Sequence, residues 1–282
     1  MTQAEQLLWV NGELVPGGSA GVRPEDRGLL YGDGLFETMR AYGGRVFCLT
    51  EHLDRLLTSA GLLQMPLQYG KDALAAAVAD TLAANEVADA YVRLTVTRGV
   101  GGRPSELDAP QACTVIITVR EYHGYPAHVY DEGLKLTFAQ ARRNETSVFS
   151  RIKSLNYLDN IIEQHQAKQG GYDEALFLNT QGIVAEGATS NVFIVEKGRT
   201  LTPPLAAGVL PGIVRGCLLA GMDMAEEAFG PERLAAADEV FLTNSLLEVA
   251  PAISLDGCPV GGGVPGPVYH QAHELYRRLL SR

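Results

Sequence analysis

The few lysines of this sequence give the first indication of chemistry. Its 282 residues contain 23 lysines and arginines, of which only five are lysines: Lys71, Lys135, Lys153, Lys168 and Lys197. Four of them belong to helix ends, a turn or an alternating strand, where solvated side chains are the rule. Lys153, in SRIKSLNYLDN, lies between an irregular segment and the expected start of a helix near Ser154. Its amine could attack a carbonyl carbon if its pKa were lowered, although its position alone also fits a surface lysine.

A carboxylate, an arginine and a helix start could complete a ligand site around such an amine. Glu186 ends an expected strand, and the run Thr189, Ser190, Asn191 after it offers hydroxyl and backbone donors or forms a simple turn. A helix opening at Pro211-Gly212 has free N–H groups that bind an anion or water. Arg55 lies off the apolar stripe of its helix, where its guanidinium either clamps a phosphate or faces solvent.

Composition narrows the possible partners. The net charge is −10 and the pI is near 5.1, which disfavours a nucleic-acid partner but permits a local basic pocket for a small anion. The four cysteines are widely spaced and form no CxxC pair, so neither a zinc site nor a disulfide framework is expected. We expect no bound metal, and reduced, mostly buried thiols of a cytoplasmic protein.

The N-terminus, MTQAEQLLWVNGELV, has no basic segment followed by a long apolar run, so no signal peptide is expected. No uncharged apolar stretch approaches the length of a membrane span. We therefore expect a soluble, intracellular protein with no membrane partner.

The elements expected in the first half are mainly strands. LLWVNGELVPG predicts a hairpin around Asn11-Gly12, and further strands are expected at 35–41, 91–99 and 112–120. A helix is expected after Thr50 as its N-cap, and an alanine-rich helix over 71–86. A segment rich in proline, glycine and polar residues, 123–132, is expected to connect an N-terminal domain, 1–122, to a C-terminal domain, 133–282.

The second half alternates between the two kinds of element. Strands are expected at 134–140, 174–179, 183–187, 191–196 and 239–244. Helices are expected over 154–169, from Pro211 through about residue 228, and at the C-terminus. The pattern predicts a mixed α/β (α+β) chain with two lobes, the N-terminal one smaller, and not a regular βαβ series.

Taken in order, these segments resemble the class IV aminotransferases, the fold-type IV pyridoxal-phosphate group. The resemblance runs through DRGLLYGDGLFETMRAYGG, EHLDRL, YVRLTVTRG, IKSLNYLDN, DEALFLNTQGIVAEGATSNVF, LPGIVR and ADEVFLTNSLLEVAP, which together span nearly the whole chain. The group includes branched-chain aminotransferases, D-amino-acid aminotransferases and aminodeoxychorismate lyases. The resemblance implies a two-lobed homodimer that binds pyridoxal 5′-phosphate between its lobes and borrows active-site walls from its partner.

The resemblance also implies roles for individual positions. Lys153 is similar to the lysine that forms the Schiff base with the cofactor, Glu186 to the acid beside the pyridine nitrogen, and Arg55 to the arginine on the phosphate. The rest of the phosphate site is expected at Ile213, Val214 and Ser245. Tyr157 resembles a tyrosine near the cofactor hydroxyl, although one residue fewer separates it from the lysine than in the branched-chain pattern. Lys153, once displaced by a substrate amine, would move the substrate proton.

Assignment within the group depends on substrate-facing positions. D-amino-acid aminotransferases carry an Arg-x-His pattern where this chain has Arg103-Pro104-Ser105. Tyr91 and Arg93 resemble the Tyr-x-Arg of branched-chain enzymes, whereas Ser245-Leu246 departs from their small substrate turn. The substrate candidates are Phe36, Arg40, Tyr91, Arg93, Arg98, Arg103 and Leu246.

We therefore expect transamination between an amino acid and a 2-oxo acid, with the branched-chain type favoured. The alternative is an aminodeoxychorismate lyase that releases pyruvate, which RGVGGRP and TNSL favour. A third possibility is a cofactor-free binding protein built on the same fold.

Overall fold

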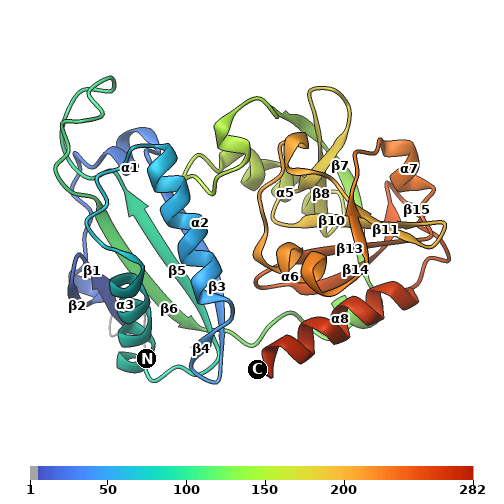
Figure 1. Ribbon diagram of the computed structural model, residues 1–282, viewed down its shortest axis with the longest axis horizontal. Coiled ribbons are helices and arrows are strands. Elements are labelled where there is room, and N and C mark those ends of the chain that lie inside the picture. Colours follow the sequence, from blue (N-terminus) through green and yellow to red (C-terminus); the bar gives the residue numbers. More distant parts are fainter. Residues whose placement is uncertain (1–5, 282) are drawn as a thin grey trace. The chain divides into compact units, whose positions relative to one another are not determined.

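The computed structural model describes residues 6–281 and divides into two compact units (Figure 1). Unit 1 comprises Met1–His123 with Lys153–Asn156, and unit 2 comprises Gly124–Ile152 with Tyr157–Arg282. The short segment Lys153–Asn156 thus packs with the N-terminal part of the chain, although it lies in the second half of the sequence. The domain limits expected from composition stay a prediction.

Unit 1 contains a six-stranded antiparallel sheet in the order β2-β1-β6-β5-β3-β4. The strands are β1 (Leu7–Val10), β2 (Glu13–Pro16), β3 (Gly34–Tyr42), β4 (Arg45–Val46), β5 (Ala90–Thr97) and β6 (Thr114–Glu121). The predicted hairpin is confirmed, because β1 pairs with β2 across Asn11 and Gly12. Both turn residues have positive φ, 49° and 106°, which Asn and Gly tolerate best.

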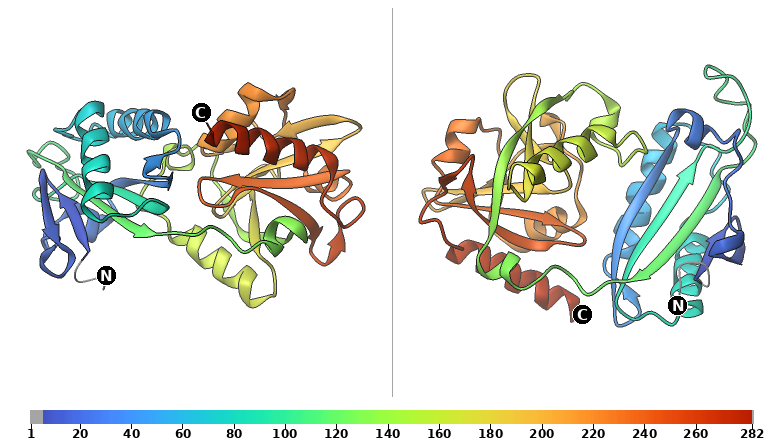
Figure 2. Two further views of the ribbon diagram at one scale, coloured as in Figure 1. Left: turned by 90° about the horizontal axis from the view of Figure 1, so that it is seen from below. Right: turned by 180° about the vertical axis from the view of Figure 1, so that it is seen from behind.

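Two long helices, α2 (Leu49–Leu62) and α3 (Lys71–Ala84), cover one face of this sheet (Figure 1). Leu35, Met39 and Leu94 point to that face and are almost completely buried. The strands seen from behind in Figure 2, right, expose the opposite face, over which neither helix lies. A short helix, α1 (Arg27–Tyr31), precedes β3, and Asp26 caps it.

The predicted cap of α2 is wrong. The helix begins at Leu49, one residue before Thr50, and Cys48 with a φ of 51° occupies the N-cap position without a side-chain hydrogen bond. The left-handed backbone at Cys48 turns the chain directly into the helix, so Thr50 already lies inside the first turn.

The helix after Lys153 also begins later than predicted, at Leu158 instead of near Ser154. Residues before it are extended because they pair with β3: Ser154 forms a bridge with Leu35, and the Leu155 amide donates to the Gly34 carbonyl at 2.9 Å. A Cβ on Gly34 would lie 2.7 Å from the Leu155 side chain, so glycine permits this close approach. The lysine segment therefore acts as a short strand at the edge of β3.

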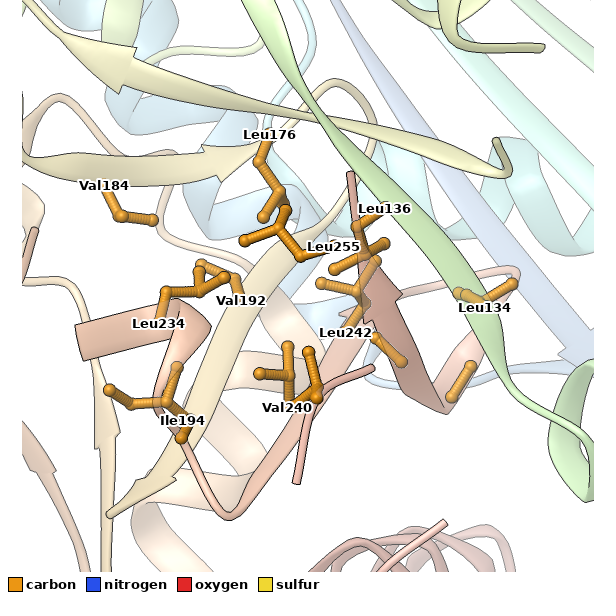
Figure 3. Packing of buried hydrophobic residues seen from close by; sticks show 14 of the residues in the cluster. Leu134, Leu136, Leu176, Val184, Val192, Ile194, Leu234, Val240, Leu242 and Leu255 are labelled. Carbon is orange, nitrogen blue, oxygen red and sulfur yellow. The ribbon is translucent and has the colours of Figure 1, made fainter. Parts of the chain in front are cut away.

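Unit 2 contains a nine-stranded mixed sheet in the order β12-β11-β10-β13-β14-β7-β8-β9, with β15 paired to β14. Its strands are β7 (Leu134–Arg143), β8 (Glu174–Asn179), β9 (Val184–Gly187), β10 (Asn191–Glu196), β11 (Arg199–Thr202), β12 (Met224–Glu226), β13 (Glu239–Asn244), β14 (Glu248–Leu255) and β15 (Cys258–Pro259). The apolar side chains of these strands, among them Leu136, Val192 and Leu242, form a buried core (Figure 3).

The helices of unit 2 are α4 (His128–Asp131), α5 (Leu158–Gln169), α6 (Ile213–Gly221), α7 (Pro231–Ala235) and α8 (Pro267–Leu280). Short 3-10 turns lie at Gly17–Ser19 in unit 1 and at Val148–Ser150 and Leu205–Ala207 in unit 2. The helix predicted to continue to about residue 228 ends at Gly221. Met224–Glu226 instead pairs in parallel with β11, because the backbone turns extended at Met222.

The mixed α+β class predicted from the sequence is confirmed by these two sheets and their helices. None of the helices within residues 6–281 is long and apolar enough to cross a membrane. The same residues contain no group of three or more potential metal-ligating side chains.

Candidate functional site

Lys153 is held by backbone pairing and lies against an aromatic ring. Its carbonyl accepts a 2.8 Å hydrogen bond from the Phe36 amide, and its Nζ lies 4.5 Å from the centre of the Phe36 ring. Phe36 is buried and Lys153 is half-buried. The amine is therefore fixed over one end of the sheet of unit 1 by a rigid strand and not by a flexible loop.

The same sheet face carries four of the predicted substrate residues. Phe36 and Arg40 lie in β3, and Tyr91 and Arg93 lie in β5, where Arg40 pairs directly with Tyr91. The Arg93 guanidinium carbon lies 4.0 Å from the Phe36 ring centre, so the ring contacts both Arg93 and Lys153. The structure therefore brings Lys153, Phe36 and Arg93 together.

Arg55 lies on the helix-covered face of the same sheet. Its Nε and Nη2 atoms donate to the two carboxylate oxygens of Glu37 at 2.8 and 2.5 Å, and His52 Nδ1 lies 2.7 Å from Glu37 Oε2. Burial raises the pKa of Glu37, but the charge of Arg55 and the hydrogen bonds from His52 and Arg55 lower it to about 2. Glu37 is thus ionised and fixes the direction of the Arg55 guanidinium.

Unit 2 holds Glu186 in a hydrogen-bond network. Its Oε2 accepts from the Leu210 amide at 3.0 Å and from Asn191 Nδ2 at 3.3 Å, and its Oε1 lies 3.2 Å from Arg143 Nη2. Asn191 also donates to the Leu210 carbonyl. Donors of this kind favour the ionised form of a carboxylate, which is the form that pairs with a protonated ring nitrogen.

The network of Glu186 leads directly to the start of α6. Gly212 is the N-cap, and Ile213 and Val214 form the first turn, whose N–H groups have no partner within the helix. A Cβ on Gly212 would lie 1.8 Å from Asn191 Oδ1, so only glycine lets the helix start approach the network. This helix end is a suitable place for an anion.

A second turn of unit 2, between β13 and β14, carries Ser245 and Leu246. Asn244 Oδ1 accepts from the amides of Leu246 and Leu247 at 2.8 and 2.7 Å, which fixes the turn. The hydroxyl of Thr243, two residues before Ser245, is buried without a hydrogen-bond partner in the described chain. An uncompensated buried donor at this end of β13 is compatible with an oxygen-rich group such as a phosphate.

The run after Glu186 is oriented by a carboxylate that the sequence did not reveal. Glu174 Oε2 accepts from the hydroxyls of Thr189 and Ser190 at 2.7 and 3.0 Å. Both hydroxyls therefore bond within the protein, and their direct binding to a cofactor stays a prediction. Tyr157 donates its hydroxyl to the Ala188 carbonyl at 3.0 Å, which joins it to the same loop.

The remaining two substrate candidates lie elsewhere in unit 1. Arg98 is buried and donates to Asp33 and to the carbonyls of Leu63 and Gln64, so it ties the end of α2 to β5. Arg103 lies exposed in the loop after β5. The structure does not place either residue on the sheet face with Lys153, and a substrate role for them stays a prediction.

Sequence reasoning missed Glu37, His52, Arg143 and Glu174. A signal existed for His52, because His52 and Arg55 lie three residues apart on one helix and can share one acceptor, but it does not identify Glu37 as that acceptor. Arg143 and Glu174 bond to residues on other segments of the unit 2 sheet, and no local spacing in the sequence indicates these contacts.

These features fit an enzyme that uses pyridoxal phosphate. The amine of Lys153, the carboxylate of Glu186 and the start of α6 match the aldehyde, pyridine nitrogen and phosphate of that cofactor in chemical type. Gly212, where a Cβ would displace Asn191, supports this fit.

Comparison with known proteins also indicates an enzyme of this kind. Residues 34–255 match the model of the family "Amino-transferase class IV". A putative branched-chain-amino-acid aminotransferase of Methanocaldococcus jannaschii is 34% identical over 98% of this chain and 96% of its own. A D-alanine aminotransferase of Staphylococcus haemolyticus is 32% identical over 97% of this chain and 98% of its own.

Solved structures extend the comparison. The branched-chain aminotransferase of Escherichia coli matches with a TM-score of 0.92 and 30% identity over 98% of this chain and 95% of its own. Another branched-chain aminotransferase (from T.th.), solved with pyridoxamine 5′-phosphate, matches with a TM-score of 0.92 and 28% identity over 99% and 95%. A putative 4-amino-4-deoxychorismate lyase of Legionella pneumophila matches with a TM-score of 0.85 and 27% identity over 93% and 96%.

The chain belongs to the class IV aminotransferases. The fold-type IV prediction is therefore confirmed, as are transamination as the class of reaction and pyridoxal 5′-phosphate as the cofactor.

Proposed function

We propose that Lys153 is the catalytic residue of this aminotransferase and that branched-chain amino acids are its principal amino donors. The observation that carries the proposal is the fixed Lys153 amine, which shares the Phe36 ring with Arg93. When bound, pyridoxal phosphate supplies an aldehyde that condenses with amines and a ring that withdraws electrons from the substrate Cα. Lys153 would take the proton from that carbon at Nζ and pass it to the cofactor carbon that carries the nitrogen, and the reverse transfer to a 2-oxo acid would complete the cycle.

The other residues are proposed to hold and orient the cofactor. Glu186 is proposed to bind the protonated ring nitrogen, and its contacts with Arg143 and the Leu210 amide keep the carboxylate in one direction. Ile213 and Val214, at the start of α6, are proposed to bind the phosphate together with Arg55 and Ser245. Tyr157 and the Thr189–Asn191 loop are proposed to line the cofactor ring, because the Tyr157 hydroxyl is bonded to that loop.

The substrate assignment is supported by the relatives and by the sheet face. The relatives named branched-chain aminotransferases reach 34% identity over nearly their whole length. Phe36 and Tyr91 offer ring surface for an apolar side chain, and Arg93 offers a guanidinium for an acidic one. Such a face suits a cycle between an apolar amino acid and an acidic 2-oxo acid.

A lyase that releases pyruvate is the second candidate. Its support is the similarity to the Legionella protein and the turn Ser245-Leu246, which departs from the branched-chain pattern. The same Lys153 would serve either reaction, so the identity of the catalytic lysine does not separate them.

Absorption spectra test the proposed catalytic lysine. Purified protein with added pyridoxal phosphate should develop the absorption band of the covalently bound cofactor, and Lys153→Ala should abolish it. Lys135→Ala, at an exposed lysine, is the matched control and should keep the band. A band and turnover that survive in Lys153→Ala would show that another residue binds the cofactor.

A substrate panel tests the reaction. One series offers L- and D-amino acids with 2-oxoglutarate or pyruvate, and a second offers aminodeoxychorismate and measures pyruvate release. Leucine, isoleucine and valine should be the best donors. Activity confined to aminodeoxychorismate would establish the lyase instead.

We also propose that the protein is a cytoplasmic homodimer. Leu158, Ile161 and Ile162 are exposed at i, i+3 and i+4 on α5, which leaves an apolar stripe on that helix. None of the four cysteines forms a disulfide, as expected in a reducing compartment, although only Cys113 is buried. Sedimentation should give a dimer, and Ile161→Asp should shift it toward monomer if α5 lies in the interface.

A further inference from the structure

Most of the partly or fully buried arginines of this protein are neutralised by carboxylates. Asp33 pairs with both Arg27 and Arg98 at 2.8 Å, and Arg143 pairs with Glu186. Such pairing is the usual arrangement, because a guanidinium that is removed from water needs compensation.

Arg93 is half-buried and differs from this pattern, and Arg120 is exposed. The Arg93 guanidinium carbon lies 4.0 Å from the Phe36 ring centre and its Nε donates to Thr95, and that of Arg120 lies 4.2 Å from the Tyr91 ring centre. Neither forms an ion pair with a carboxylate among residues 6–281. Both positive charges therefore remain available to an anion, on a chain whose net charge is −10.

The strand register arranges these groups in rows that lead away from Lys153. The first row contains Phe36 and Thr95 and lies under the Lys153 amine. The second contains Arg93 between Thr38 and Thr118, and the third contains Tyr91 between Arg40 and Arg120. Directly paired residues point to the same face, and successive rows lie about 7 Å apart.

The aromatic rings give these arginines a defined direction. A guanidinium that stacks on a ring keeps its N–H groups free at the edge, where they match the two oxygens of a carboxylate. Arg40 strengthens the third row, because its guanidinium lies between Tyr42 and Tyr122, at 4.4 and 5.2 Å from their ring centres. The third row is thus a second positive position, farther from Lys153 than Arg93.

We propose that Arg120, supported by Tyr91, forms a distal anion subsite that takes the terminal acid group of amino acids with side chains longer than that of glutamate. The proposal rests on the function proposed for Lys153, because it assumes that the α-amino group reacts at that end of the sheet. A terminal acid on a short chain reaches Arg93 in the second row. A chain with additional methylene groups carries the acid toward the third row.

A chain-length series tests this subsite on the holoenzyme. The donors are glutamate, 2-aminoadipate, 2-aminopimelate and 2-aminosuberate, each in the enantiomer that the enzyme accepts. Each is compared with a neutral amino acid of equal chain length, so that the ratio of the two kcat/KM values isolates the effect of the acid group. The variants are Arg120→Gln and, as matched control, Arg23→Gln, at an exposed arginine of the same unit that lies before α1 and outside the sheet.

The acid-to-neutral ratio of wild type should stay high beyond glutamate, and Arg120→Gln should lower it about ten-fold for 2-aminopimelate, the loss of one charge-assisted contact. Arg23→Gln should leave every ratio unchanged. A ratio that collapses beyond glutamate in wild type, or that Arg120→Gln does not change, overturns the subsite.

A binding measurement separates this inference from the proposed function. Pimelate has no amino group, so calorimetry measures its binding without turnover. Weaker pimelate binding in Arg120→Gln than in wild type and Arg23→Gln supports the subsite even if no amino acid reacts. Equal binding in all three proteins, or none in wild type, contradicts it, whereas absence of the cofactor band would contradict only the function proposed for Lys153.

Discussion

Replacing Glu37 with glutamine removes the carboxylate that orients Arg55. Glu37 is buried in β3 and bonds to both Arg55 and His52. Its pKa falls from the ordinary 4.5 to about 2, because Arg55 and His52 outweigh the effect of burial. A pKa difference of this size corresponds to about 3 kcal/mol of folding stability near neutral pH. Glu37→Gln should therefore destabilise unit 1 by about 3 kcal/mol.

The pH dependence gives the same prediction a second signature. Because the folded-state pKa is depressed, the stabilisation is complete above pH 4.5 and is lost as the pH falls toward 2. The stability difference between wild type and Glu37→Gln should shrink by about 1.4 kcal/mol per pH unit below 4.5.

Trp9 allows the stability of unit 1 to be measured separately. It is the only tryptophan of the chain and is buried in β1, so its fluorescence during urea unfolding reports on unit 1. The matched control is Asp54→Asn, which removes an exposed ion pair between α2 and Lys71 and should change stability by less than about 1 kcal/mol. If Glu37→Gln is no more destabilising than Asp54→Asn, or its effect does not depend on pH, the Glu37 carboxylate does not hold Arg55 as described.

Three further changes should have measurable effects. Burial raises the pKa of Glu174 despite its hydrogen bonds. Protonated Glu174 therefore stabilises the folded state at low pH, and this stabilisation is lost as the pH rises above 4.5. Calorimetric melts of Glu174→Gln should show a smaller loss of stability over this pH range. Gly212→Ala should weaken cofactor binding about ten-fold in absorbance titrations, because its Cβ would displace Asn191 from the anion site. Leu242→Ala should destabilise unit 2 by about 3 kcal/mol in urea unfolding followed by circular dichroism, since Leu242 is fully buried in the core.

Several site residues were recognisable in the sequence because their signals are local. Glu186 follows an apolar strand and precedes turn residues, and Pro211-Gly212 marks the start of α6. Arg55 was placed off the apolar stripe of its helix, whereas in the structure its side chain is only 10% exposed and bonds to Glu37 of the sheet. Its carboxylate partner was not predicted, because Glu37 lies in a strand whose register cannot be read from α2.

Arg98 makes contacts that the sequence did not predict. It was one of the substrate candidates, and that role stays a prediction. In the structure its guanidinium satisfies Asp33 and two carbonyl groups at the end of α2. The carbonyl groups at the end of α2 require hydrogen-bond donors because they are buried when α2 packs against the sheet, and Arg98 supplies these donors.

The sequence by itself predicted the family, the cofactor class, most strands and helices, and Lys153 as the candidate lysine. These conclusions depend on residue types and spacings that act over a few positions. Only the tertiary structure shows that the segment 153–156 pairs with β3, since the bridged residues Leu35 and Ser154 are 119 positions apart in the sequence. It also places Arg93 and Arg120 in successive rows on the face with Lys153. Strand register and burial set these relations, because a strand shifted by one residue would turn every side chain to the opposite face.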